Sequence, residues 1–245
     1  SCSCIKARHA LAANAFVGFF VVYCLRVNLS VALVAMVNST SSANDSDNDE
    51  CPDSTPNNAS TSAASTGEFD WDENTQAVIL GAFFYGYVVT QVPGGWLAGR
   101  FGGKKLFGFG VLCTSLLTLV TPVAARAGVP YFIAVRVLEG IGEAVTFPAM
   151  HAMWGVWAPI YERSRLVAIP LSGSQLGTVF AMPLSGLLCQ YGFAGGWPSV
   201  FYVFGALGCV WFVVWMVLVH DSPSQHPRIS AGERRFIEQS IGKKQ

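Results

Sequence analysis

Six long stretches of the chain are almost entirely apolar, and polar segments separate them. A helix needs about 20 predominantly apolar residues to cross the hydrocarbon core of a lipid bilayer. Each stretch is long enough, so the pattern predicts an all-α polytopic membrane protein with six transmembrane helices. The predicted spans are residues 11–37, 76–98, 105–125, 130–153, 166–191 and 198–219.

The composition agrees with this class of protein. The 245 residues are 52% hydrophobic and 12% charged, whereas a soluble domain has about 25% charged residues. We therefore expect a lipid bilayer as one partner of the chain, and no nucleic acid.

The basic residues predict how the chain is oriented in the membrane. Cytosolic loops of membrane proteins carry an excess of Lys and Arg, a bias known as the positive-inside rule. With the N-terminus in the cytosol, 12 of the 15 basic residues fall on the cytosolic side, so both ends of this chain are predicted to be cytosolic. These residues are Lys6, Arg8, Arg100, Lys104, Lys105, Arg163, Arg165, Arg228, Arg234, Arg235, Lys243 and Lys244.

The segment between the first two spans, residues 38–75, is predicted to be a disordered loop on the non-cytosolic side. It is rich in Ser, Thr, Asn and Asp, and such a composition buries too little apolar surface to fold. Three Asn-X-Ser/Thr sequons lie in this loop, and they predict N-glycosylation. The predicted glycosylation sites are Asn38, Asn44 and Asn58.

The chain is accordingly divided into four regions. Residues 1–37 hold the cytosolic N-terminus and the first helix, the loop follows, and residues 76–219 hold the other five helices. Residues 220–245 form a cytosolic segment. Within this segment, Ser230-Ala-Gly-Glu233 is a capping box that predicts the start of a short amphipathic helix.

Four charged residues interrupt the apolar spans. Arg26 lies in the first span, and Arg136, Glu139 and Glu143 lie in the fourth. A charged residue at the bilayer centre costs about 2.5–3.5 kcal/mol on insertion scales, so such residues usually face a cavity and serve a function. The three in the fourth span are spaced i, i+3 and i+7, which places them on one face of a helix.

The heights of the two arginines suggest a shared binding site. At a rise of about 1.5 Å per residue, both lie roughly 10–15 Å below the non-cytosolic ends of their helices. We predict that Arg26 and Arg136 face each other across a cavity and bind a small anion, because a guanidinium group pairs bidentately with a carboxylate. The alternative is that Arg136 and the glutamates only neutralise one another, an expensive way to stabilise a fold.

Glu139 and Glu143 are predicted to couple proton binding to anion binding. Ionised glutamates compete with the anion for the arginines, whereas protonated glutamates leave the arginines free. Protonation and anion binding then favour each other, which is the thermodynamic basis of proton–anion symport. Such a transporter is driven by a proton gradient and needs no cofactor.

Three further residues are candidates for the same site. Tyr23 lies on the same helix face as Arg26, and Tyr87 belongs to a mid-membrane stripe in the second span. Both are predicted to contact the substrate, and a buried tyrosine with a satisfied hydrogen bond is the alternative for Tyr87. His151, near the cytosolic end of the fourth span, is predicted to act in gating or proton relay, with a structural hydrogen bond as the alternative.

The sequence does not indicate an enzyme. It contains no HExxH pair, and no Asp lies within the predicted spans. We therefore expect neither an intramembrane catalytic site nor a metal site.

Several motifs resemble those of the major facilitator superfamily. Residues 94–105 resemble the signature between its second and third helices, although Gly99 stands where the superfamily usually has an acid. Further motifs resemble the sialin-like family of anion transporters within that superfamily. They are Leu25-Arg-Val-Asn-Leu-Ser-Val-Ala-Leu-Val34, Phe84-Tyr-Gly-Tyr87, Thr90-Gln-Val-Pro-Gly-Gly95, Leu138-Glu-Gly140, Thr146-Phe-Pro-Ala-Met-His-Ala-Met-Trp154, Trp157-Ala-Pro159 and Glu162-Arg-Ser164.

This resemblance implies that the chain is the N-terminal six-helix half of a transporter, with a C-terminal six-helix half as its partner. It implies proton-coupled export of sialic acid and other acidic sugars from the lysosome, with glutamate and aspartate as further substrates. It assigns carboxylate binding to Arg26 and Arg136 and proton coupling to Glu139 and Glu143. It also links Tyr87 and His151 to transport.

Two alternatives remain open. The first is a glutamate- or phosphate-type anion transporter of the same family. Vesicular glutamate transporters have a histidine where this chain has Gly81 and a glutamine where it has Glu139, and both differences favour the sialin-like assignment. The second alternative is a truncated membrane protein that does not transport.

Overall fold

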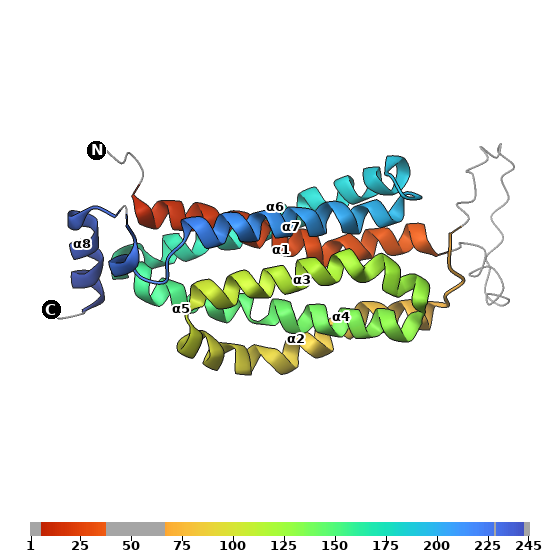
Figure 1. Ribbon diagram of the computed structural model, residues 1–245, viewed down its shortest axis with the longest axis horizontal. Helices are drawn as coiled ribbons and strands as arrows, with labels where there is room; N and C mark the ends of the chain where they lie inside the picture. The colour runs from red at the N-terminus through yellow and green to blue at the C-terminus, as the bar shows by residue number, and fades with distance from the viewer. Residues whose placement is uncertain (1–5, 38–66, 228, 243–245) are drawn as a thin grey trace, which may run out of the picture.

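The protein is described by a computed structural model that covers residues 6–37, 67–227 and 229–242, and within these residues it is almost entirely helical (Figure 1). Two short 3-10 turns, η2 (Ile160–Glu162) and η3 (Pro223–Gln225), accompany the α-helices. The α-helices are α1 (Ala7–Met36), α2 (Glu73–Phe101), α3 (Gly103–Ala127), α4 (Val129–Ala144), α5 (Thr146–Trp157), α6 (Arg163–Tyr191), α7 (Trp197–Leu218) and α8 (Ala231–Ile241).

The membrane-protein prediction is confirmed, with one correction. Within the described residues, five helical segments are long and apolar enough to cross a membrane: α1, α2, α3, the segment Ile160–Tyr191 and α7. The fourth predicted span is not one continuous helix, because α4 ends at Ala144 and α5 begins at Thr146.

Pro148 explains where the fourth span is interrupted. Proline has no N–H group, and its ring clashes with the carbonyl group four residues earlier, which here belongs to Ala144. Val145, with φ −77° and ψ −12°, joins the two helices, and the Thr146 hydroxyl donates to the Glu143 carbonyl at 2.7 Å. The interruption therefore follows directly after Glu143.

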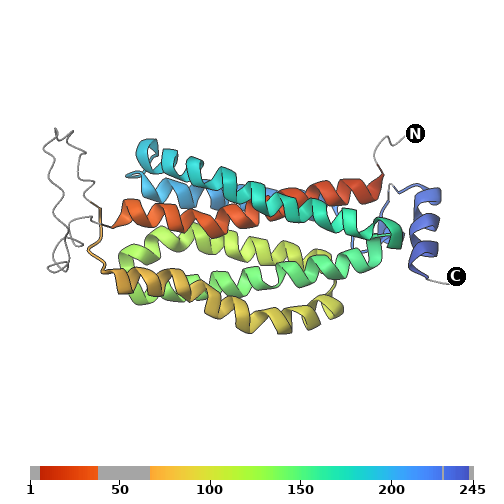
Figure 2. The ribbon, with the colours of Figure 1, turned by 180° about the vertical axis from the view of Figure 1, so that it is seen from behind.

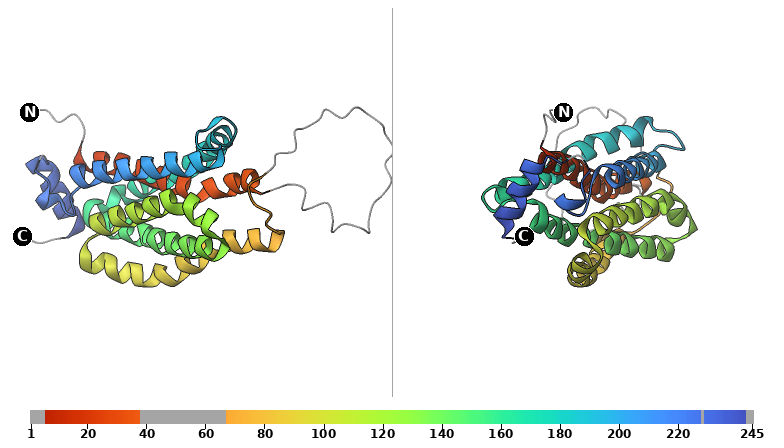
Figure 3. Two further views of the ribbon diagram at one scale, coloured as in Figure 1. Left: turned by 45° about the vertical axis from the view of Figure 1, so that its right-hand side comes forward. Right: turned by 60° about the vertical axis from the view of Figure 1, so that its left-hand side comes forward.

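The long helices lie side by side along one axis, and the start of α1 lies at the same end of the bundle as α8 (Figures 1 and 2). Each of the first three helices packs mainly on a helix of the second half of the chain: α1 on α6, α2 on α4, and α3 on α7. The views in Figure 3 show α1, α6 and α7 on one side of the bundle and α2, α3 and α4 on the other. Residues from both halves of the sequence thus meet along the middle of the bundle.

Glycines allow α1 and α6 to approach closely. A Cβ atom at Gly173 would meet the backbone oxygen of Phe16, and one at Gly177 would meet that of Phe20. Small residues at four-residue spacing let membrane helices pack backbone to backbone. This contact fixes the rotation of α1 and therefore the direction of its polar side chains.

Replacement of Gly177 by valine is expected to destabilise the bundle, because the added carbons would push α6 away from α1. Overpacking of this kind typically costs about 1–3 kcal/mol. Thermal unfolding in detergent, followed by circular dichroism, measures the effect. The matched control is Gly186→Val, also in α6, since a Cβ atom there has no neighbour within 4 Å. Equal stability of the two variants would show that the close approach is not required.

The end of the predicted disordered loop is ordered, which corrects the prediction for residues 67–72. The Phe69 N–H donates to the Met36 carbonyl at 3.0 Å, and the Phe69 ring stacks on Trp71 at 4.4 Å. Trp71 lies 5.8 Å from the Phe132 ring. Two aromatic side chains supply enough apolar surface to dock this short segment on the helix ends. Residues 38–66, with the predicted sites Asn38, Asn44 and Asn58, lie outside the described residues.

Glu68 fixes this docked segment through a polar contact. Its carboxylate accepts a hydrogen bond from Arg126 Nε at 2.9 Å and one from Trp197 Nε1 at 3.0 Å. The hydrogen bond from the Arg126 guanidinium holds the pKa of Glu68 below its usual value.

The Glu68→Gln variant is expected to lose a small, pH-dependent part of its stability. A carboxyl group whose pKa is lowered by folding stabilises the fold at high pH, and this contribution is lost as the pH falls through the folded-state pKa. Exposed ion pairs contribute about 0.2–1 kcal/mol. Thermal unfolding should show the deficit of the variant at pH 7, and the deficit should shrink as the pH falls below the usual carboxyl pKa of 4.5 and vanish below the lower folded-state pKa. A deficit that is the same at every pH would contradict this role.

Candidate functional site

A buried ion pair joins α1 to α4 in the middle of the bundle. Arg26 Nε donates to Glu143 Oε1 at 2.6 Å, and Arg26 Nη2 contacts the same oxygen. The Glu143 side chain is 1% exposed, whereas that of Arg26 is 19% exposed. The carboxylate is therefore enclosed, and the guanidinium group stands at the edge of the buried region.

Aromatic rings surround the Arg26 guanidinium group. Its Cζ atom lies 4.9 Å from the ring centre of Tyr23, 4.9 Å from that of Tyr87 and 5.2 Å from that of Phe83. A guanidinium group within about 6 Å of an aromatic face is attracted by the electron-rich ring. These rings hold Arg26 in place without providing a second negative charge.

An open cavity of about 360 Å³ lies beside this cluster. Tyr23 and Tyr87 form part of its wall, so the two predicted substrate contacts do lie together next to Arg26. His151 also lines the cavity, and so do Phe147 and Pro148 of the segment that follows the break between α4 and α5. The cavity therefore brings the predicted gating histidine to the two tyrosines, although α1, α2 and α5 supply them separately.

A second ion pair lies within α4. Arg136 Nη1 donates to Glu139 Oε2, and both side chains are almost completely buried. Two hydroxyl groups of α3 donate to the other carboxylate oxygen, Thr118 Oγ1 at 3.2 Å and Thr121 Oγ1 at 3.1 Å. Each hydroxyl has a single proton and also donates to a backbone carbonyl four residues earlier, at 2.8 Å for Thr118 and 2.9 Å for Thr121. The Glu139 carboxylate thus accepts from Arg136 and shares the two hydroxyl protons with these carbonyls.

The two glutamates differ in how well their charge is satisfied. Among the described residues, Glu143 Oε2 is a buried oxygen with no hydrogen-bond partner, and Arg26 alone donates to this carboxylate. Glu139 has donors on both of its oxygens. A buried carboxylate that lacks donors is costly to keep ionised, so protonation of Glu143 would relieve an unsatisfied buried charge.

The prediction that Arg26 and Arg136 face each other across a cavity stays a prediction. Both guanidinium groups contact the ring of Phe83, at 5.2 Å for Arg26 and 5.3 Å for Arg136, so the two arginines do lie against the same buried side chain. In this conformation neither arginine is among the residues that line the cavity, and Arg136 is 3% exposed. Residue spacing predicts similar heights for the two groups, but height does not determine whether a cavity separates them.

Sequence reasoning missed Phe83, Thr118 and Thr121. Phe83 is one apolar residue among many in α2, and no pattern distinguishes it. The threonines do carry a signal, because Thr114, Thr118 and Thr121 lie on one face of an otherwise apolar span. Such a stripe facing a helix with buried glutamates indicates hydrogen-bond partners.

The sequence matches that of known transporters along almost its whole length. The pattern of the Major Facilitator Superfamily matches residues 15–244. Sialin from Homo sapiens is 51% identical over 239 residues, which cover 97% of this chain and 48% of sialin. A putative inorganic phosphate cotransporter from Drosophila melanogaster is 43% identical, over 97% of this chain and 45% of that protein.

Vesicular glutamate transporter 1 from Xenopus laevis is 41% identical, over 98% of this chain and 39% of that protein. The chain thus spans about half the length, or less, of these curated relatives. They are transporters, not enzymes.

The fold is also that of a solved transporter. The inward-open conformation of the xylose transporter XylE from E. coli superposes with a TM-score of 0.65 at 16% sequence identity, over 96% of this chain and 53% of XylE. At this identity the likeness concerns the fold alone. It confirms the prediction that the chain has the fold of one half of a facilitator-type transporter.

Proposed function

Because this chain belongs to the Major Facilitator Superfamily, we propose that it forms the N-terminal half of a proton-coupled symporter for organic anions. The proposed substrates are sialic acid and other acidic sugars, exported from the lysosome. The second half of the transporter, a further six-helix unit, is the proposed partner across the open side of the cavity. Similarity to sialin supports the substrate class.

One observation carries the proposal: the ion pair between an enclosed Glu143 and an Arg26 that stands beside an open cavity. Arg26 lies directly behind Tyr23 and Tyr87 of the cavity wall, and its guanidinium group is already paired with Glu143. An anion and the Glu143 carboxylate therefore compete for the same guanidinium group.

Protonation of Glu143 removes this competition. When Glu143 is protonated, the attraction between it and Arg26 is weakened, and the guanidinium group can turn its donors to a carboxylate in the cavity. Tyr23 and Tyr87 flank the guanidinium group and line the cavity, so both are placed to contact the bound anion. Proton and anion then bind cooperatively, as symport requires.

The proposed role of Glu139 differs from that of Glu143. Its hydrogen bonds stabilise the ionised form, and the resulting negative charge balances Arg136. In the proposal, Glu139 couples to protons when an anion contacts Arg136, which is 3% exposed in this conformation and must first become accessible. His151 lies on the cavity wall and is proposed to gate the cavity or to relay the proton.

The topology remains part of the proposal. Both ends of this chain are assigned to the cytosol, and the loop with Asn38, Asn44 and Asn58 is assigned to the lysosomal lumen, where glycosylation is proposed. A proton gradient directed out of an acidic lumen would drive the export.

A second candidate is transport of glutamate or phosphate by the same site. Relatives at 41% and 43% identity carry these names, and a guanidinium group pairs with either a carboxylate or a phosphate. A membrane protein that does not transport is the third candidate.

Uptake by the complete transporter in reconstituted vesicles tests the proposal. Radiolabelled sialic acid, glutamate and phosphate are offered separately, with and without an inward proton gradient. We expect gradient-dependent accumulation of sialic acid above the other two. Accumulation of another anion would change the substrate, equal uptake with and without the gradient would exclude symport, and no uptake of any anion would support the non-transporting candidate.

A further inference from the structure

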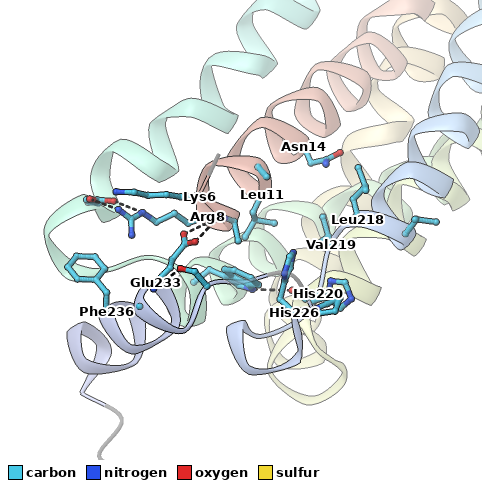
Figure 4. A pocket seen from close by; sticks show the side chains of 18 residues that line it. Lys6, Arg8, Leu11, Asn14, Leu218, Val219, His220, His226, Glu233 and Phe236 are labelled. Atoms are coloured by element: carbon cyan, nitrogen blue, oxygen red, sulfur yellow. Dashed lines mark hydrogen bonds and ion pairs between the residues drawn. The ribbon is translucent and has the colours of Figure 1, made fainter. Parts of the chain in front are cut away.

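A second, larger cavity of about 920 Å³ lies at the end of the bundle where α1 begins and α7 ends. It shares no lining residue with the cavity beside Arg26. Residues from the start of α1, the end of α7 and α8 surround it (Figure 4). Its volume is in the range of ligand-binding cavities, about 300–1,000 Å³.

Specific hydrogen bonds hold α8 against this cavity. The Ser230 hydroxyl accepts from the Glu233 N–H at 3.1 Å, which confirms the predicted cap. The Glu233 carboxylate does not complete the capping box of α8. It caps α1 instead, because it accepts hydrogen bonds from the N–H groups of Ala7 at 3.0 Å and Arg8 at 3.3 Å. The N-terminus of α1 and that of α8 are thereby joined into one wall.

The carboxylates that line the cavity are already satisfied. Glu233 accepts the two backbone hydrogen bonds just described. Glu162 pairs with Arg8 through contacts of 3.0 and 2.9 Å, and Arg8 also lies 5.1 Å from the centre of the Phe236 ring. Lys6, by contrast, has no ion-pair partner among the described residues. The formal charges of Lys6, Arg8, Glu162 and Glu233 cancel, but Glu233 already caps the N-terminus of α1, so among the described lining residues Lys6 is the cation left for a ligand.

An unpaired nitrogen adds to this polar wall. His220 Nδ1 is buried and has no hydrogen-bond partner within the part of the chain that the structure describes. The His220 ring lies 5.0 Å from that of His226, and both line the cavity. Buried polar atoms are normally hydrogen-bonded, so a turn of the His220 ring that exposes Nδ1 to the cavity would let a polar group of a ligand complete this arrangement.

The opposite side of the cavity is apolar. In Figure 4, Leu218 and Val219 lie across the cavity from Lys6 and Arg8. Val217 and Leu218 belong to the last turn of α7, a predicted membrane span, and are 69% and 50% exposed. The cavity thus has a polar side that carries Lys6 and an apolar side that continues onto the exposed surface at the end of α7.

We propose that this cavity binds an anionic phospholipid from the leaflet at this end of the bundle. The phosphate lies near Lys6, His220 turns Nδ1 toward the polar headgroup, and an acyl chain lies along the exposed Val217 and Leu218. A soluble phosphate compound would leave the apolar side of the cavity uncovered. The site requires only the membrane-spanning fold and does not depend on the transport proposal.

Native mass spectrometry of the full chain, purified in detergent, tests the site. Phosphatidylserine, phosphatidylcholine and the soluble headgroup compound glycerophosphoserine are added separately at equal concentrations. We expect retention of phosphatidylserine in preference to phosphatidylcholine, and no competition by glycerophosphoserine. Equal retention of the two lipids would overturn the preference for an anion, and effective competition by glycerophosphoserine would overturn the membrane lipid as the ligand.

Two variants locate the bound lipid. Lys6→Gln is expected to weaken phosphatidylserine binding about fivefold, the usual effect of one basic residue near an anionic membrane. Its control is Lys105→Gln, because Lys105 is also exposed at this end of the bundle but does not line the cavity. The same loss in both variants, or in neither, would place the lipid elsewhere.

The second variant, Gly232→Phe, fills part of the cavity. A Cβ atom at Gly232 meets no other atom within 4 Å, and phenylalanine favours the helix more than glycine does. We expect one phosphatidylserine fewer per protein. Gly186→Phe is the control, since Gly186 also has open space around it but lies in α6, away from the cavity. An unchanged number of bound lipids in Gly232→Phe would contradict the proposal, and Lys6→Gln tests the site independently if Gly232→Phe does not fold.

Discussion

Replacement of Glu143 by glutamine is expected to abolish proton-driven accumulation of the anion while it leaves exchange of the anion across the membrane intact. Glutamine resembles the protonated glutamate in shape and charge, so Arg26 no longer has a competing carboxylate at 2.6 Å. Anion binding then no longer depends on a proton. Symport with one proton supports about tenfold accumulation of a monoanion per pH unit of gradient, and the variant should lose this factor entirely.

Radiolabelled uptake by the complete transporter, with and without a proton gradient, measures the loss. Counterflow, in which unlabelled anion inside the vesicles exchanges for labelled anion outside, shows that the variant still binds and moves its substrate. Glu73→Gln is the matched control, because Glu73 is an exposed glutamate at the start of α2. Accumulation in Glu143→Gln equal to that in the control would refute the role of Glu143.

Replacement of Arg136 by glutamine should cause the largest loss of stability. The Arg136 and Glu139 side chains are 4% and 1% exposed, so the substitution would leave a buried carboxylate without its counter-charge. Removal of one partner of a buried ion pair costs about 3–5 kcal/mol. Thermal unfolding in detergent should show this loss directly.

A double variant separates the lost charge pair from lost packing. In Arg136→Gln with Glu139→Gln neither charge of this pair remains, and Thr118 and Thr121 can donate to the new amide oxygen. We therefore expect the double variant to recover most of the stability that the single variant loses. A double variant as unstable as Arg136→Gln alone would show that packing, and not the unpaired charge of Glu139, is responsible.

The membrane topology was predictable from the sequence because the bilayer imposes a strict requirement. Backbone polar groups cannot be left unsatisfied in hydrocarbon, so a long apolar stretch has to form a helix. The correspondence between predicted spans and helices α1, α2, α3, α6 and α7 follows from this rule. The motif comparison then identified the superfamily, which hydropathy alone does not do.

The break between α4 and α5 was not predicted, although its cause is visible in the sequence. Hydropathy averages over the whole stretch from Val129 to Trp154 and does not respond to a single proline. Pro148 acts on the carbonyl group of Ala144, the last residue of α4, so the interruption lies at Val145, three residues before the proline.

The charged residues could be identified from the sequence, but their pairing could not. Their rarity in apolar spans singled out Arg26, Arg136, Glu139 and Glu143. Which glutamate pairs with which arginine depends on the rotation of α1 and α4, and close packing at glycines such as Gly177 sets the rotation of α1. A local sequence pattern does not show such contacts, because they join segments that are far apart in the sequence.

The number of protons taken up when the anion binds to the complete transporter tests the central claim most directly. A pH indicator in weakly buffered solution records this number during titration with the substrate. We predict uptake of about one proton per anion by the unsubstituted protein and none by the Glu143→Gln variant, because linked binding requires the group that accepts the proton. Equal proton uptake by the two proteins would contradict the account.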